Sequence, residues 1–319
     1  MSTAQHVENF LQLLTAGILT GVIYGLMCAG LSLIFGVMRV INFAQGEFMM
    51  LGMYVAWYCF GIATGFSFFP ELIAPYAAAL VAGPVVFLLG LVGHKTLISR
   101  VTGTSSARLD SEGHYAQLIL TLGISLVLAN GAQAWFGSAP VSISTPLSST
   151  PWIVGPLRGE EILIFVNQAQ SFAALVALAV VAAFLVVMGR SRLGRSLRAA
   201  ADNPEAAVYM GIDVDRAYRI AFGLGVGITA IGGGLLASTN PFQPHIGIEY
   251  VIVMYAGVVL GGLGSLGGAF LGGLIIGLVR ELSPLVLPTQ LQNTSIFVCF
   301  LIIVLLRPQG LFGKAARRA

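Results

Sequence analysis

The chain has 319 residues, of which 57% are hydrophobic and only 9% are charged, and its formal net charge is +3. A soluble domain carries about a quarter charged residues, so this composition excludes a water-soluble globule and predicts an all-α polytopic membrane protein. The small net charge gives no indication of a nucleic-acid partner, and we expect none.

Apolar stretches that suit membrane helices recur along the whole chain. A membrane-spanning helix needs about 20 predominantly apolar residues. Such stretches lie at 11–37, 43–62, 74–93, 116–136, 170–189, 220–237 and 294–306, with a long glycine-rich stretch at 250–279. We therefore expect about eight transmembrane helices plus a glycine-broken re-entrant hairpin, in a single transmembrane domain over 1–319.

The basic residues are distributed asymmetrically between the two sides of the membrane. Lys and Arg gather after the first stretch, in the 94–115 and 190–219 connections and at the C-terminus, and only Arg158 and Arg280 fall on the other side. Cytoplasmic loops carry such an excess of Lys and Arg. The bias therefore predicts that the C-terminus is cytoplasmic and that the N-terminus lies outside.

The segment 250–281 must then begin and end outside, because 220–237 runs outward and the last stretch runs inward. Five glycines at 261–268, around Ser265, favour a turn near its middle. We expect a re-entrant hairpin of two short helices, or two thin spans. Its turn, with Gly264 and Ser265, is predicted to lie against the solute pathway or near the cytoplasmic face. Tight helix packing is the alternative role for these residues.

Apart from Glu47, early in 43–62, the apolar stretches lack the ionisable residues that an enzyme or a proton-driven carrier needs, and sodium coupling through carbonyl and hydroxyl groups stays open. No Asp, Glu, Lys or Arg occurs in 116–157, 162–189, 220–248, 250–279 or 282–306. Carriers driven by protons need such groups inside the membrane. The four histidines lack companions at catalytic or metal-ligand spacing, and no phosphate-binding loop is present. We expect no enzymatic activity, no metal and no cofactor in this chain, so a partner must supply the energy.

The 190–219 connection contains a short helix with clear boundaries. Asp202 or Asn203 can cap its N-terminus, and Pro204 suits its first position. Glu205 favours the positive end of the helix dipole, and Gly211 can take the left-handed conformation after the last turn. About seven residues are too few for a stable isolated helix, so this one needs a surface to lie on. A partner protein is one such surface, and the membrane is the other.

A polar cluster follows the first apolar stretch. Asn42, Gln45 and Glu47 lie together there, with Gly46 allowing close backbone approach. Polar groups at membrane depth are costly and are often functional, which makes these residues candidates for the solute pathway. Alternatively, Arg39 and Glu47 pair at the cytoplasmic interface and only brace the turn.

The short helix in 190–219 resembles the coupling helix of ABC-importer permeases, where Glu-Ala-Ala followed by Gly docks on the ATPase subunit. Tyr24–Tyr54 (YGLMCAGLSLIFGVMRVINFAQGEFMMLGMY) resembles the opening of the branched-chain amino-acid permeases, and GGLGSLGG at 261–268 and RPQGLFG at 307–313 are similar too. The resemblance covers essentially the whole chain, although many relatives have histidine at the position of Gln45. The residues that it assigns to the ATPase contact are Ala201, Asp202, Asn203, Pro204, Glu205, Ala206, Ala207, Tyr209, Met210 and Gly211.

The resemblance implies a permease subunit that forms half of a pathway for branched-chain or other hydrophobic amino acids. It implies a second homologous permease, two ABC ATPase subunits that bind ATP, an extracytoplasmic solute-binding protein and a location in the bacterial inner membrane. A related importer for urea or short amides remains an alternative. A self-sufficient facilitative or sodium-coupled carrier, and a receptor-like membrane protein without transport, are alternatives of a different class.

Overall fold

The computed structural model describes residues 3–65, 70, 72–102, 111–155, 163–307 and 310–312. Five of the basic residues used to predict orientation lie outside this part of the chain: Arg108, Arg158, Lys314, Arg317 and Arg318.

Eight helices of the described residues are long and apolar enough to cross a membrane, by length and composition. They are α1 (Thr3–Met38), α2 (Gln45–Gly65), α3 (Ala74–Gly93, continued by the π-helical η1, His94–Ile98), α5 (Ser111–Phe136), α7 (Gln168–Arg190), α10 (Val214–Leu236), α12 (Leu266–Leu282, continued by the 3-10 helix η2, Ser283–Leu285) and α13 (Gln292–Leu306, preceded by the 3-10 helix η3, Thr289–Leu291). The all-α membrane class is therefore confirmed. The eight long helices agree with the predicted number of about eight, but they include α12, which is one arm of the predicted hairpin. A ninth apolar helix, α11 (Ile246–Gly261), has 16 residues.

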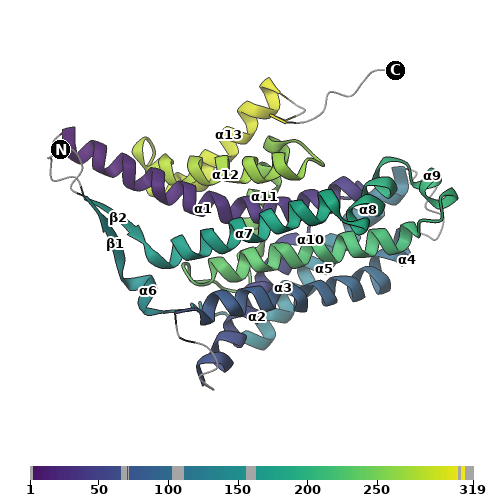
Figure 1. Cartoon of the computed structure of the whole chain (residues 1–319), viewed down its shortest axis with the longest axis horizontal. Helices are drawn as coiled ribbons and strands as arrows, with labels where there is room; N and C mark the ends of the chain where they lie inside the picture. Colours follow the sequence, from purple (N-terminus) through teal and green to yellow (C-terminus); the bar gives the residue numbers. More distant parts are fainter. Residues whose placement is uncertain are drawn as a thin grey trace.

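Helices α1 and α10 form the centre of the bundle. In the most apolar 18-residue segment of each helix, 83% of the residues are buried in α1 and 78% in α10, but only 22% in α5 and 6% in α13. Glycine allows this central packing, since a Cβ on Gly30 of α1 would lie 2.5 Å from the carbonyl oxygen of Gly225 of α10. Many side chains of α5 and α13 are correspondingly exposed, and lipid or other subunits can cover them. Helix α13 projects from the bundle in Figure 1.

Helices α11 and α12 form the predicted glycine-broken hairpin. Gly262 and Gly264 have φ angles of +99° and +83°, a backbone conformation that favours glycine, so the turn is confirmed. Helix α12 runs antiparallel to α1, because Gly264 lies beside Gly36 and Leu278 lies beside Gly17. Helix α12 thus lies beside α1 from Gly17 to Gly36, about 28 Å at 1.5 Å per residue. A re-entrant hairpin and two thin spans both stay predictions.

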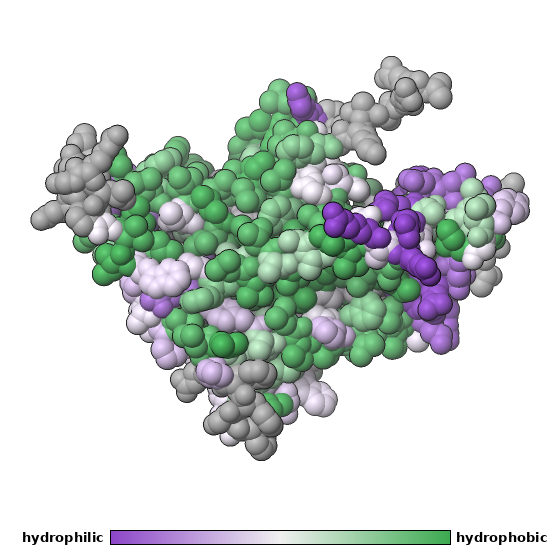
Figure 2. Space-filling model, in the orientation of Figure 1, coloured by the Kyte–Doolittle hydropathy of each residue, from purple (hydrophilic) through white to green (hydrophobic). Residues whose placement is uncertain are grey.

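The two ends of the bundle differ in structure and polarity. One end carries the helices α8 (Arg192–Asp202) and α9 (Pro204–Tyr209) and the short α4 (Ser99–Thr102). The opposite end carries α6 (Pro146–Ser149) and a two-stranded antiparallel sheet of β1 (Pro151–Val154) and β2 (Ile164–Asn167). Hydrophilic residues gather at the α8–α9 end, and the body between the ends is mostly hydrophobic (Figure 2).

Candidate solute pathway and coupling segment

The segment between α1 and α2 turns back into the bundle. Arg39 adopts a φ of +55°, which is uncommon for a residue other than glycine, and it ends α1. The Asn42 Oδ1 atom then accepts a hydrogen bond of 3.2 Å from the backbone N–H of Ala44. This local turn is typical of Asn, and it directs the chain into α2.

Gln45 joins α2 to the two central helices. Its Nε2 atom donates to Thr229 Oγ1 at 2.6 Å and to the carbonyl oxygen of Gly225 at 3.3 Å, both on α10. Its Oε1 atom accepts from Asn42 Nδ2 at 2.9 Å, and Thr229 Oγ1 also lies 3.3 Å from the carbonyl oxygen of Met27 on α1. Met27 and Thr229 lie well inside their helices. Helix α2 therefore begins inside the bundle and not at its surface.

Glu47 lies in the first turn of α2, where its side chain is only 1% exposed. Its Oε1 atom accepts a hydrogen bond of 3.4 Å from Ser125 Oγ on α5, while its Oε2 atom has no hydrogen-bond partner among the described residues. The carboxyl group packs against Gly247 of α11, where an added Cβ would lie 2.6 Å from it. Three helices thus enclose this group.

Gly46 is the point of closest approach between α2 and α11. A Cβ on Gly46 would lie 2.0 Å from the carbonyl oxygen of Gly247, which is closer than real atoms come. The close backbone approach expected at Gly46 is confirmed, and no larger residue fits there without moving a helix.

Arg39 and Glu47 are held by different partners in the described part of the chain. The Arg39 guanidinium donates to the carbonyl oxygen of Ala201 on α8 at 3.4 Å, whereas Glu47 contacts Ser125. The alternative in which these two residues pair and brace the turn therefore lacks support from the geometry. Arg39 instead links the turn before α2 to the α8–α9 region.

Gly264 and Ser265 lie apart from the cluster around Glu47, at the turn between α11 and α12. Gly264 lies beside Gly36 near the end of α1, and Ser265 caps α12 by accepting a hydrogen bond of 3.2 Å from the backbone N–H of Gly268. Their observed contacts are those of a turn and a helix cap, and a part in the solute pathway stays a prediction for both.

Helix α9 has the boundaries expected from the sequence. Asn203 is its N-cap, because Asn203 Oδ1 accepts from the backbone N–H of Ala206 at 3.0 Å, and Pro204 occupies the first turn. Gly211 follows the helix with a φ of +78°. Ala207 faces the bundle and is buried, whereas Tyr209 and Met210 are 89% and 81% exposed. The helix therefore presents large apolar side chains outward, beyond the end of the bundle.

Helix α8 was not predicted, although it holds α9 in place. Its buried residues are Gly194, Leu197 and Ala200, which repeat at helical spacing among the arginines. Ser191 caps its start by accepting from the backbone N–H of Gly194 at 3.0 Å, and the Arg198 guanidinium donates to the carbonyl oxygen of Met188. The serine followed by this apolar spacing is the signal that the sequence offered.

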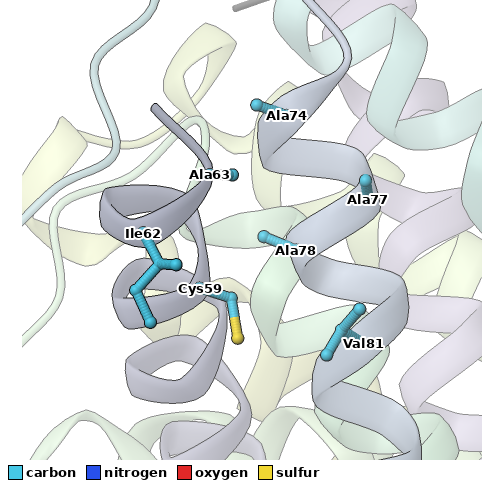
Figure 3. Close-up of a pocket in the computed structure, with 7 residues that line it drawn as sticks. All are labelled: Cys59, Ile62, Ala63, Ala74, Ala77, Ala78 and Val81. Atoms are coloured by element: carbon cyan, nitrogen blue, oxygen red, sulfur yellow. The ribbon is translucent and has the colours of Figure 1, made fainter. Parts of the chain in front are cut away.

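An apolar groove between α2 and α3 is the concave feature shown in Figure 3. Its volume is about 290 Å³, and its lining residues are Cys59, Ile62, Ala63, Ala74, Ala77, Ala78 and Val81. Cys59 of α2 points toward α3 across the groove (Figure 3). Because no lining side chain carries a charge, the groove suits an apolar chain better than a zwitterionic solute.

Comparisons with known proteins match nearly the whole chain. The family model described as branched-chain amino acid transport system / permease component matches residues 13–306. The chain is 29% identical to the high-affinity branched-chain amino acid transport system permease protein LivH of Escherichia coli K12, over 96% of each chain. It is 28% identical to BraD, the corresponding permease protein of Pseudomonas aeruginosa, over 97% of each chain.

A more distant similarity covers part of the chain. The ribose import permease protein RbsC of Escherichia coli K12 is 27% identical over 64% of this chain and 60% of its own length. No solved structure matches the chain.

Proposed function

Because the chain belongs to the family of branched-chain amino acid transport system permease components, we propose that it forms half of the solute pathway of an ATP-driven importer for branched-chain or other hydrophobic amino acids. In this proposal it pairs with a second homologous permease, two ATPase subunits bind and hydrolyse ATP, and an extracytoplasmic binding protein delivers the solute. The chain itself catalyses no reaction and holds no cofactor.

The observation that carries the proposal is the exposed apolar surface of α9. Tyr209 and Met210 are almost fully exposed at the polar end of the molecule, and Val208 is 56% exposed. Large apolar side chains that project from an otherwise hydrophilic surface are typical of a protein interface, and aromatic residues are common among the residues that dominate binding. A groove on an ATPase subunit accounts for this surface.

The α8–α9 region is also connected to the interior of the bundle. Leu197 and Ala200 anchor α8 against the bundle, and Arg39 joins Ala201 of α8 to the turn that precedes Asn42 and Gln45. A displacement of α9 by the ATPase can therefore be transmitted through α8 and the contact between Ala201 and Arg39 to the start of α2. We infer that this path shifts the pathway between its outward- and inward-open states.

The residues around Gln45 are the candidates for the pathway itself. Asn42, Gln45 and Glu47 are the buried polar side chains where α2 begins, and Ser125 of α5 contacts Glu47. In the proposed orientation, the α8–α9 end faces the cytoplasm of a bacterium and the β1–β2 end lies outside the inner membrane. The cluster then lies at membrane depth, between the two aqueous sides.

The test is solute-stimulated ATP hydrolysis by the co-purified complex in liposomes, with leucine-loaded binding protein present. We expect Tyr209→Arg to lower the stimulated rate roughly tenfold, the loss that follows from removing one dominant interface residue. The matched control is Ser149→Arg, which places the same side chain at an exposed position of α6 at the opposite end of the molecule.

Two results would contradict the proposal. One is unchanged stimulation in Tyr209→Arg, which would place the ATPase contact elsewhere. The other is leucine transport by the isolated chain with no ATPase co-purifying, which would favour the self-sufficient carrier. Import of urea or a short amide with ATPase coupling would keep the importer and change its solute.

A further inference from the structure

Among the described residues, no cation balances the buried carboxyl group of Glu47. Its side chain is 1% exposed, and no basic residue in the described part of the chain acts on it. Ser125 supplies a single hydrogen bond to Oε1, and Oε2 is left without a partner among those residues. Burying an ionised group costs far more than burying a neutral polar one, so such a group is ordinarily paired.

The neighbouring polar groups do not need Glu47. Asn42, Gln45 and Thr229 form a hydrogen-bonded chain with one another, and Gln45 also uses the carbonyl oxygen of Gly225. Glu47 thus keeps unused hydrogen-bonding capacity beside a network that is already joined. If Glu47 only stabilised the fold, both of its carboxyl oxygens would be expected to accept hydrogen bonds from the protein. A group that binds a ligand keeps an oxygen free for it.

We propose that Glu47 is the subsite that receives the ammonium group of an amino-acid solute during translocation, a role that rests on the proposed importer function. An ammonium group donates hydrogen bonds and carries the positive charge that a buried carboxylate lacks. Gly247 of α11 allows this geometry, since any side chain at its position would collide with the Glu47 carboxyl group.

Access to Glu47 requires movement of α5. Ser125 belongs to α5, where 22% of the residues in the most apolar segment are buried, against 39% for α2. In α11, which contributes Gly247, ten of the 16 residues are buried. Of the helices that contact the Glu47 side chain, α5 is therefore the one held by the least packing. Its displacement breaks the 3.4 Å contact between Ser125 and Glu47 and exposes the carboxyl group to an arriving solute.

The experiment measures leucine uptake per ATP hydrolysed by the complete complex in proteoliposomes with leucine-loaded binding protein. Glu47→Gln keeps the size of the side chain and its hydrogen bond to Ser125 but removes the charge. We expect uptake per ATP to fall roughly tenfold, the typical effect of losing one hydrogen bond to a charged group. Glu47→Asp keeps the charge and should restore part of the uptake.

The matched control is Glu249→Gln, the same substitution at an exposed position of α11, which should leave uptake unchanged. Thermal stability and the amount of co-purified ATPase report on folding for each variant. Wild-type uptake by Glu47→Gln would overturn the inference, because a neutral group would then suffice. Equal losses in Glu47→Gln and Glu47→Asp with lowered stability would also overturn it, since they indicate a structural role.

The importer proposal fails in a different way. If the wild-type complex imports an uncharged amide and no amino acid, the ammonium subsite is wrong while the ATP-driven importer stands. If the wild-type chain recruits no ATPase and imports nothing, both proposals fail.

Discussion

Gly46 is the residue where the backbones of two helices come into closest contact around the candidate site. A methyl group there would lie 2.0 Å from the carbonyl oxygen of Gly247, and a carbonyl oxygen of the backbone cannot rotate away. We predict that Gly46→Ala destabilises the protein by about 1–3 kcal/mol, the usual cost of overpacking a well-packed interior. Its thermal denaturation in detergent should show a lowered midpoint.

Gly61 in the same helix provides the comparison. An added Cβ on Gly61 meets no atom within 4 Å, and the residue lies inside α2. Gly61→Ala should therefore leave the midpoint unchanged or raise it, since alanine is the better helix former by up to about 1 kcal/mol. Equal midpoints for the two variants would show that α2 and α11 do not meet at Gly46.

Tyr24 illustrates how a polar contact is placed inside an apolar pair of helices. The Arg280 guanidinium of α12 donates to the hydroxyl group of Tyr24 on α1, and it also lies 5.8 Å from the centre of the Tyr24 ring. The Nε atom of Arg280 is buried and lacks a partner among the described residues. The hydrogen bond to the Tyr24 hydroxyl therefore stabilises the positive charge of Arg280, which would be costly without a partner.

We predict that Tyr24→Phe lowers the free energy of unfolding by about 1–3 kcal/mol, because a partly buried charged donor loses its acceptor. The ring itself stays, including its edge contact with Tyr250 at 5.9 Å. Tyr58→Phe removes a hydroxyl group from a side chain that is 64% exposed, so it should have no effect. A stability of Tyr24→Phe equal to that of the wild type would mean that Arg280 depends on another group, such as Glu281.

At the scale of the elements, the long helices follow from the length of apolar runs, which is why they were predictable. The observed helix boundaries differ from the predicted ones where polar residues next to an apolar run are also helical. Helix α1 begins at Thr3 and not at residue 11, because the helix continues through polar residues that an apolar window does not include. For the same reason, helix α13 begins at Gln292 and not at residue 294.

Elements stabilised by tertiary contacts were harder to predict. Helix α8 has arginines on its exposed face, so one arginine falls in each interval between its buried residues Gly194, Leu197 and Ala200. The inward start of α2 depends on the bond from Gln45 to Thr229, which lies 184 positions away. No local pattern marks Thr229, Ser125 or Gly247 as neighbours of the polar cluster. Only the packing of α5, α10 and α11 brings them there.

The whole molecule is polarised along the direction of its helices. The β1–β2 sheet and α6 lie at one end, and α8 and α9 lie at the other (Figure 1). The turn of the α11–α12 hairpin lies near the end of α1 that contacts α8, because Gly264 lies beside Gly36 and Arg39 reaches Ala201. The segment after α13 returns to the same place, since the backbone N–H of Leu311 donates to the carbonyl oxygen of Leu260 at 2.7 Å.

This arrangement predicts the side from which single cysteines react with a membrane-impermeant maleimide. Ser149→Cys in α6 should react in intact cells, whereas Tyr209→Cys in α9 should react only in inverted membrane vesicles from which the ATPase subunits have been removed. Leu263→Cys in the hairpin turn, where the native side chain is 48% exposed, should react from the same side as Tyr209→Cys. The unsubstituted chain is the control, since Cys28 is buried and Cys59 and Cys299 are partly buried.

Reaction of Leu263→Cys from outside, or from neither side, would mean that the α11–α12 hairpin stops short of the cytoplasmic face. The reversed pattern at positions 149 and 209 would invert the proposed orientation and remove α9 from the reach of a cytoplasmic ATPase.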